Sequence, residues 1–84
     1  MLGLLGMYQI IGQQECVYCE LACARLEDLD IPYKYRSITN NPRLKRFFRR
    51  RGYRTVPQIW REGVHIGGYN ELAKHLDNLY NKGV

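Results

Sequence analysis

Residues 8–19 have the sequence YQIIGQQECVYC, a short apolar run followed by a polar turn and two cysteines. The run from Tyr8 to Gly12 is typical of a buried strand, and residues 12–15 are typical of the loop that leaves it. From Cys16 onward, apolar residues recur at positions 19, 22, 23, 26 and 29, which is the period of an amphipathic helix. This part of the chain therefore predicts a strand, a loop and a helix with Cys16 at its N-terminus.

A second strand is predicted at residues 33–38, where aromatic and charged side chains alternate. The Asp-Ile-Pro segment at 30–32 ends the helix before it. A strand, a helix and a strand in this order predict a parallel βαβ unit.

A short basic helix is expected next. Asn41 has the side chain of an N-cap, Pro42 suits the first helical position, and Gly52 supplies the stop. Its predicted apolar stripe consists of the residues at 44, 47 and 48. The remaining positions of this helix are almost all Arg or Lys, which makes its outer face strongly positive.

The last third of the chain predicts two strands and a helix. Residues 56–60 and 64–66 are short strand-like runs joined by a connection of hairpin length. Gly67 and Gly68 then interrupt the pattern before a final helix, whose apolar face would carry residues 72, 76, 79 and 80. The predicted element order is βαβαββα.

Length and charge limit the possible functions. A chain of 84 residues has room for one domain, which we expect at 7–84, with residues 1–6 as an N-terminal extension. The chain has 13 Lys and Arg against 8 Asp and Glu, a net charge of +5, which suits an anionic partner of any class. The opening residues lack the basic flank of a signal peptide, and no run reaches the roughly 18 apolar residues of a membrane span. We therefore expect a cytoplasmic protein.

The three cysteines lie within eight residues, which does not suit the disulfide framework of a secreted domain. A helix N-terminus favours the thiolate form of Cys16, and Cys19 is close enough to attack a disulfide formed there. We therefore predict Cys16 as the nucleophile and Cys19 as the resolving thiol. The alternative is a structural pair or half of a zinc site, but His65 and His75 are not spaced as the second half. Cys23 is predicted to be a packed core thiol.

Three segments together resemble the glutaredoxin family: CVYC at 16–19, TVPQIW at 55–60 and HIGGYNE at 65–71. Val17 stands where most members have Pro, and this variant is similar to small phage-encoded glutaredoxins. The resemblance implies the thioredoxin-like α/β fold, a four-stranded mixed sheet flanked by three helices, with a cis peptide before Pro57. It also implies a glutathione-dependent enzyme that reduces protein disulfides and glutathione mixed disulfides, with ribonucleotide reductase as a client.

The resemblance further implies where glutathione would bind. The Val56 backbone would pair with its cysteinyl part, and the turn at Gly68 with the helix after it would hold the γ-glutamyl carboxylate. Glu71 would meet the ammonium group. Gln13 stands near where many relatives have Lys or Arg, so the glycyl carboxylate would be met by the basic segment of Arg49, Arg50, Arg51 and Arg54, with Arg51 or Arg54 preferred. The full predicted glutathione site is Tyr18, Arg51, Arg54, Thr55, Val56, Pro57, Gly68, Tyr69, Asn70 and Glu71.

Other functions stay open at this point. They are a redoxin reduced by thioredoxin reductase, an iron–sulfur or metal carrier using Cys16, and a non-catalytic basic adaptor that binds nucleic acid through residues 43–54. For the leading interpretation we expect no resident metal, no nucleic-acid or membrane partner, and a monomer. The location would be the host cytoplasm if the protein is phage-encoded.

Overall fold

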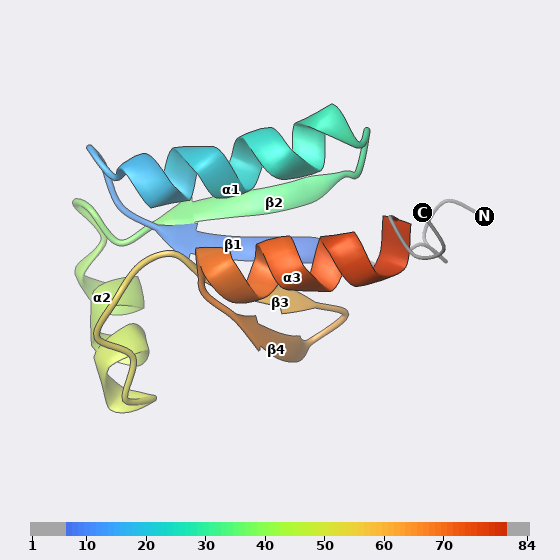
Figure 1. Cartoon of the computed structure of the whole chain (residues 1–84). Helices are drawn as coiled ribbons and strands as arrows, with labels where there is room; N and C mark the ends of the chain where they lie inside the picture. The colour runs from blue at the N-terminus through green and yellow to red at the C-terminus, as the bar shows by residue number, and fades with distance from the viewer. Residues whose placement is uncertain (1–6, 81–84) are drawn as a thin grey trace.

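The computed structural model describes residues 7–80, so the predicted extension at 1–6 lies outside the described residues. The elements follow the predicted order (Figure 1). They are β1 (Tyr8–Gly12), α1 (Val17–Asp28), β2 (Tyr33–Ser37), α2 (Pro42–Arg50), β3 (Gln58–Arg61), β4 (Val64–Gly67) and α3 (Tyr69–Tyr80).

The four strands form one mixed sheet in the order β2-β1-β3-β4. β1 pairs in parallel with β2, as the predicted βαβ unit requires, and antiparallel with β3. Ile10 lies in the middle of the sheet, opposite Tyr35 on one side and Ile59 on the other. The predicted fold class, a four-stranded mixed sheet with three helices, is confirmed.

The two faces of the sheet are covered by different helices. Successive residues of β1 point to opposite faces, so neighbouring side chains pack against different helices. Ile10 packs on the face covered by α1 and α3, and Ile11 packs on the face covered by α2. The larger core consists of Tyr8, Ile10, Ala22, Leu26, Ile31, Ile59, Leu72 and Leu76. The smaller one consists of Ile11, Ile38, Leu44 and Phe48.

Local signals at the helix ends act as predicted. The Asn41 side chain accepts a 3.1 Å hydrogen bond from the Leu44 amide, and Pro42 takes the first helical position. Gly52 follows α2 with φ of +86°, a conformation that glycine adopts without strain. Asn41 and Gly52 thus set the limits of this short helix.

Four residues predicted on buried faces are exposed instead: Leu29, Phe47, Leu79 and Tyr80. Leu29 is the C-cap of α1, and Leu79 and Tyr80 occupy the last turn of α3, where nothing described covers them. In α2 the contact with the sheet is made by Leu44 and Phe48, four residues apart. Phe47 lies at the edge of that stripe and faces outward.

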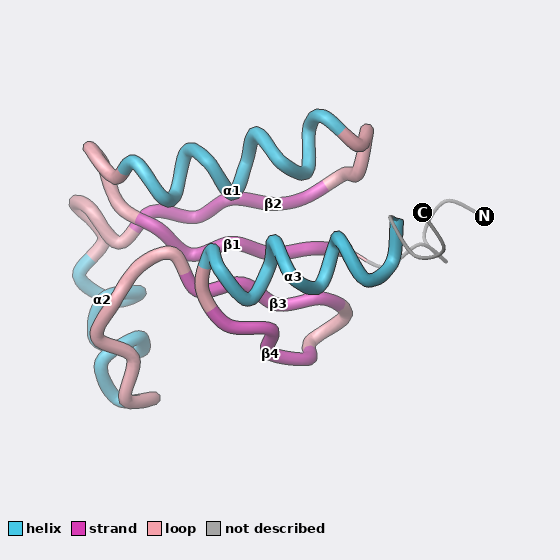
Figure 2. The backbone as a smooth tube through the Cα atoms, viewed as in Figure 1, coloured by secondary structure: helices cyan, strands magenta, loops and turns pink. Residues whose placement is uncertain are grey.

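The third strand also starts later than predicted. β3 begins at Gln58 rather than at Val56, because Pro57 has no N–H to donate to a ladder. The segment 51–57 is therefore a loop. Figure 2 shows that this loop, the loop between β1 and α1, and the start of α3 all lie at the same end of the sheet.

Candidate active site

Cys16 and Cys19 form a disulfide at the start of α1, with their Cα atoms 5.2 Å apart. Cys16 is the N-cap residue, and its Sγ accepts a 3.1 Å hydrogen bond from the Cys19 amide. The same amide would stabilise a Cys16 thiolate after reduction. Cys16 is partly exposed, whereas only 1% of the Cys19 surface is accessible. An incoming disulfide can therefore reach Cys16, while Cys19 is placed to attack from beneath.

Cys23, the third thiol, is free and packs against the larger core, as predicted. Burial raises the pKa of the Cys23 thiol above its ordinary value, and the carboxylates of Glu27 and Glu20 act in the same direction. A raised pKa favours the neutral thiol, which is a poor nucleophile. Cys23 therefore has the properties of a structural residue.

The loop before β3 is held by a buried glutamine. The peptide between Val56 and Pro57 is cis, as the family resemblance implies. The side-chain amide of Gln58 donates to the Thr55 carbonyl at 3.0 Å, and its oxygen lies 2.7 Å from Nε2 of His65. Gln58 thereby ties the loop to strand β4.

The diglycine turn leads directly into α3. Gly67 has φ of +132°, which a residue with a side chain rarely adopts. The Gly68 amide donates a 2.9 Å hydrogen bond to Oε1 of Glu71. This bond, together with one from the amide of Glu71 itself, holds the pKa of the Glu71 carboxyl below its ordinary value. Glu71 is thus a charged cap on the start of α3.

Most of the predicted glutathione residues meet in one surface depression of about 290 Å³. The Tyr18 ring on α1 lies 5.7 Å from the Tyr69 ring on α3, between centroids. The lining residues are Tyr18, Thr55, Val56, Pro57, Gly68, Tyr69, Asn70 and Glu71. All the predicted residues except the two arginines are therefore brought together beside the cysteine pair.

The two arginines are placed differently. Arg54 lines a larger depression, of about 790 Å³, that adjoins the first through Thr55 and Val56. Arg51 lines neither, and its Cζ lies 5.2 Å from the centre of the Phe47 ring.

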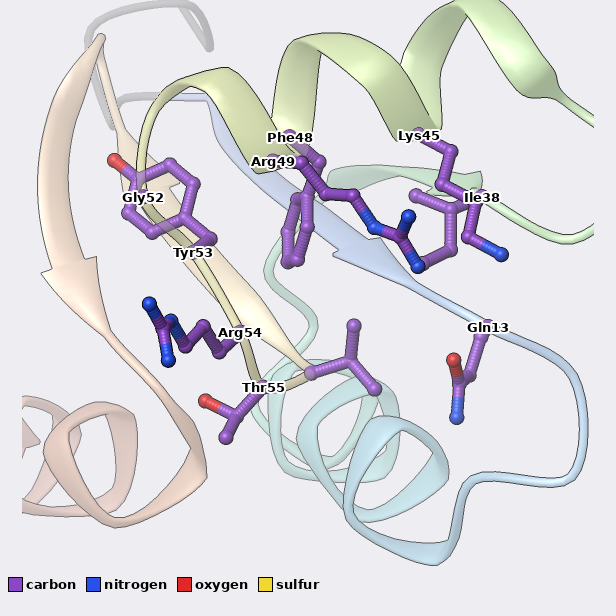
Figure 3. Close-up of a pocket in the computed structure, with 10 residues that line it drawn as sticks. Gln13, Ile38, Lys45, Phe48, Arg49, Gly52, Tyr53, Arg54 and Thr55 are labelled. Atoms are coloured by element: carbon purple, nitrogen blue, oxygen red, sulfur yellow. The ribbon is translucent and has the colours of Figure 1, made fainter.

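Two other basic residues also line the larger depression: Arg49, which was expected there only after Arg51 and Arg54, and Lys45, which sequence reasoning missed. Figure 3 shows both side chains extending from α2 toward Gln13, whereas the Arg54 side chain extends the other way. Lys45 and Arg49 are four residues apart, and each directly follows one residue of the buried pair Leu44 and Phe48. Residues at this spacing lie on the same side of a helix, so the sequence held a signal for both.

The family model of glutaredoxin matches residues 7–66, well over half of the chain. The chain belongs to the glutaredoxin family. A probable glutaredoxin of Acanthamoeba polyphaga mimivirus is 32% identical over 84 residues, covering 86% of this chain and 79% of that protein. This chain is thus similar to a viral member of the family along most of its length.

Solved structures of other glutaredoxins are similar to this glutaredoxin as well. The crystal structure of Glutaredoxin 1 from Francisella tularensis, complexed with cacodylate, aligns with a TM-score of 0.78 and 27% identity. That match covers 92% of this chain and 99% of the other. A buckwheat glutaredoxin–glutathione complex aligns with a TM-score of 0.70 at 23% identity, covering 88% and 72% of the two chains, and shows the fold alone.

The family and the cysteine geometry together establish the chemistry. The protein is a thiol–disulfide oxidoreductase with Cys16 and Cys19 as its disulfide-forming pair. Within residues 7–80, no group of three or more His, Cys, Asp or Glu side chains is arranged to hold a metal ion. No helix in the same part of the chain is long and apolar enough to cross a membrane.

Proposed function

We propose that this glutaredoxin uses glutathione both as its reductant and as part of its substrates. Members of the family use glutathione. The observation that supports the proposal most strongly is the depression beside the cysteine pair, which is lined by the residues at 18, 55–57 and 68–71. A tripeptide with two carboxylates also gives a use to the positive charge of the larger depression that adjoins this one.

Each part of glutathione has a suitable partner in this arrangement. The backbone of Val56 can pair with the cysteinyl residue in the manner of an added strand. The amides of Tyr69 and Asn70 lie in the first turn of α3 and have no acceptor within the helix, so they suit the γ-glutamyl carboxylate. Glu71 lies next to them and suits the ammonium group of the same residue.

The glycyl carboxylate would lie at the other end of the tripeptide. The larger depression adjoins Val56 and carries Lys45, Arg49 and Arg54. Lys45 and Arg49 extend toward Gln13 (Figure 3), so we assign the carboxylate to this pair, with Arg54 as the third cation. Arg51 is left out of this assignment because it lies against Phe47.

For a glutathionylated protein, the reaction takes two displacements. The Cys16 thiolate attacks the glutathione sulfur, the protein sulfur leaves as a thiolate and takes a proton, and Cys16 becomes glutathionylated. A second glutathione thiolate then attacks the glutathione sulfur on Cys16. Oxidised glutathione leaves, and the Cys16 thiolate is regenerated.

For a protein disulfide, Cys19 is needed as well. Cys16 attacks one sulfur, which leaves the other client sulfur as a thiol and links the two proteins. The Cys19 thiolate then attacks Cys16, the second client thiol is released, and the Cys16–Cys19 disulfide forms. Two glutathione molecules return this disulfide to the dithiol and leave as oxidised glutathione. A client such as ribonucleotide reductase, in the cytoplasm, would fit this route.

A coupled assay tests the proposal. Reduction of a glutathionylated peptide is followed with glutathione, glutathione reductase and NADPH, for wild type and for Cys16→Ser, Cys19→Ser and Cys23→Ser. We expect Cys16→Ser to fall to the buffer rate, Cys19→Ser to stay active on this substrate but not on a protein disulfide, and Cys23→Ser to match wild type.

Two results would overturn the proposal. One is turnover that survives without Cys16. The other is turnover that requires thioredoxin reductase in place of glutathione and its reductase, which would make the protein a redoxin of that system. Iron and a visible absorption band in the purified protein would instead favour the cluster carrier.

A further inference from the structure

Charge is distributed very unevenly along this chain. Residues 31–61 contain no Asp or Glu and hold 10 of the 13 Lys and Arg residues. The rest of the chain holds 3 basic and 8 acidic residues, so the two parts carry +10 and 3 − 8 = −5. The net charge of +5 therefore understates the charge of the segment that contains α2.

α2 presents two separate basic sides. Leu44 and Phe48 face the sheet, and Lys45 and Arg49 face the larger depression, where glutathione would use them. A further set lies on the outward side of the helix and has no role in that site. We call this set the arginine face, and it consists of Arg43, Arg46 and Arg50, with Phe47 and Arg51 at its border.

The charge of the arginine face is not neutralised by any carboxylate of the described part of the chain. All five of its residues are exposed. Within residues 7–80, none of its four guanidinium groups forms an ion pair with a carboxylate. Like charges at this density repel one another in the folded state and destabilise it. Acidic groups from another molecule would remove that repulsion on binding.

Phe47 gives the face an apolar contact point. Its side chain is 43% exposed, and Arg51 lies over its ring at 5.2 Å. Aromatic and Arg side chains are enriched at the centres of protein interfaces, where Arg makes paired hydrogen bonds to carboxylates. The chemistry therefore matches a peptide with acidic and some apolar side chains.

The helix that carries the arginine face lies at the same end of the sheet as the reacting thiol. Figure 1 shows α2 at the end of the sheet where α1 begins, and α1 begins at Cys16. The loop 51–57 runs from the end of α2 directly to Thr55 and Val56 in the predicted glutathione site. A client whose disulfide reaches Cys16 would bring its neighbouring residues over α2.

We propose that the arginine face docks an acidic segment that flanks the reactive cysteine of protein clients. The proposal rests on the proposed function, because it treats the bound protein as the oxidised substrate. A protein is favoured over a nucleic acid because α2 lies at the same end of the sheet as a dithiol, and a protein, unlike a nucleic acid, can supply a disulfide for that dithiol to reduce.

The test uses two peptides that differ only in charge. Both carry one cysteine, and one has a run of glutamates beside it while the other has glutamines. Binding is measured by fluorescence anisotropy with the cysteine changed to serine, and reduction is measured with the cysteine glutathionylated. The proteins are wild type, Arg46→Gln/Arg50→Gln and the control Lys34→Gln/Lys74→Gln, which loses the same charge elsewhere on the surface.

We expect the Arg46→Gln/Arg50→Gln variant to bind the acidic peptide roughly threefold to tenfold more weakly at low salt, and to lose the same factor in kcat/KM. All three proteins should bind and reduce the glutamine peptide equally well. Rising salt should remove the difference.

Three results would contradict the docking proposal. They are equal binding of both peptides by wild type, an equal loss in the Lys34→Gln/Lys74→Gln control, and tight binding of a single-stranded oligonucleotide that the acidic peptide does not displace. If wild type reduces neither peptide, the proposed function fails instead. The anisotropy measurement still decides whether the arginine face binds acidic segments.

Discussion

Glu71 closes the N-terminus of α3 by accepting a 2.9 Å hydrogen bond from the Gly68 amide. The carboxylate therefore belongs both to the helix cap and to the depression beside Cys16. Its pKa lies below the ordinary value because two backbone amides donate to it. The unfolded chain lacks these bonds and holds its proton more tightly. Stability from this group is thus present at neutral pH and lost as the pH falls through the lowered pKa.

The acid sensitivity of Glu71 can be measured directly. We expect Glu71→Gln to unfold at lower urea concentration than wild type at about pH 7, and the gap to be smaller at an acidic pH that protonates Glu71. The matched control is Glu20→Gln, on the exposed side of α1. A gap between wild type and Glu71→Gln that is the same at both pH values would contradict the account.

The lack of a side chain at Gly12 is expected to be essential for the position of Cys19. A Cβ at residue 12 would lie 2.8 Å from the Cys19 Sγ and would also collide with the Tyr35 hydroxyl. We expect Gly12→Ala to lower the free energy of unfolding by about 1–3 kcal/mol. The reduction of protein disulfides should slow as well, because Cys19 must move.

The double variant Gly12→Ala/Tyr35→Phe separates the two contacts at Gly12. Removing the Tyr35 hydroxyl should restore part of the stability in urea denaturation, while the contact with Cys19 persists and the slow resolution remains. Full stability in Gly12→Ala itself would show that the packing around Cys19 is looser than described.

Gln58 is expected to act as a positioning residue for the Thr55–Pro57 loop. Its side chain is buried and joins the Thr55 carbonyl to His65. Gln58→Leu should cost about 1–3 kcal/mol, because the groups that bond to it lose their partner. A loosened loop should raise KM for a glutathionylated peptide more than it lowers kcat. Gln9→Leu, an exposed change on β1, is the control, and an unchanged KM in Gln58→Leu would remove this role.

The two phenylalanines of α2 test how this helix is rotated on the sheet. Phe48 is 3% exposed and Phe47 is 43% exposed. We expect Phe48→Ala to cost about 3–5 kcal/mol of unfolding free energy, and Phe47→Ala about 1 kcal/mol or less. Similar losses at both positions, measured by urea denaturation, would mean that the arginine face points elsewhere.

Features with a local cause could be predicted from the sequence. Asn41, Pro42 and Gly52 delimit α2 through bonds and dihedrals within a few residues of each other. The pairing of Cys16 with Cys19 is likewise local, because the two residues stand at the N-cap and in the first turn of α1. Family resemblance supplied the cis peptide and the residues that meet in the depression lined by Tyr18 and Tyr69, which lie far apart in the chain.

Features that depend on packing between elements could not be predicted in this way. Periodicity places Phe47 beside Leu44 and Phe48, but only Leu44 and Phe48 of α2 are buried in the cluster with Ile11 and Ile38, and Phe47 stays outside. The rotation of α2 about its axis also decides that Lys45 and Arg49, rather than Arg51, line the larger depression. That rotation depends on contacts with residues outside the helix, among them Ile11, Ile38 and Trp60.

The central claim is that Cys16 exchanges disulfides with glutathione. Cys19→Ser removes the resolving thiol, so a glutathionyl group transferred to Cys16 should stay there. The reduced variant is mixed with oxidised glutathione, and the modified peptide is located by mass spectrometry. The account predicts one glutathionyl group per chain, on Cys16, and none in Cys16→Ser/Cys19→Ser. A group found on Cys23, or no adduct at all in Cys19→Ser, would contradict it.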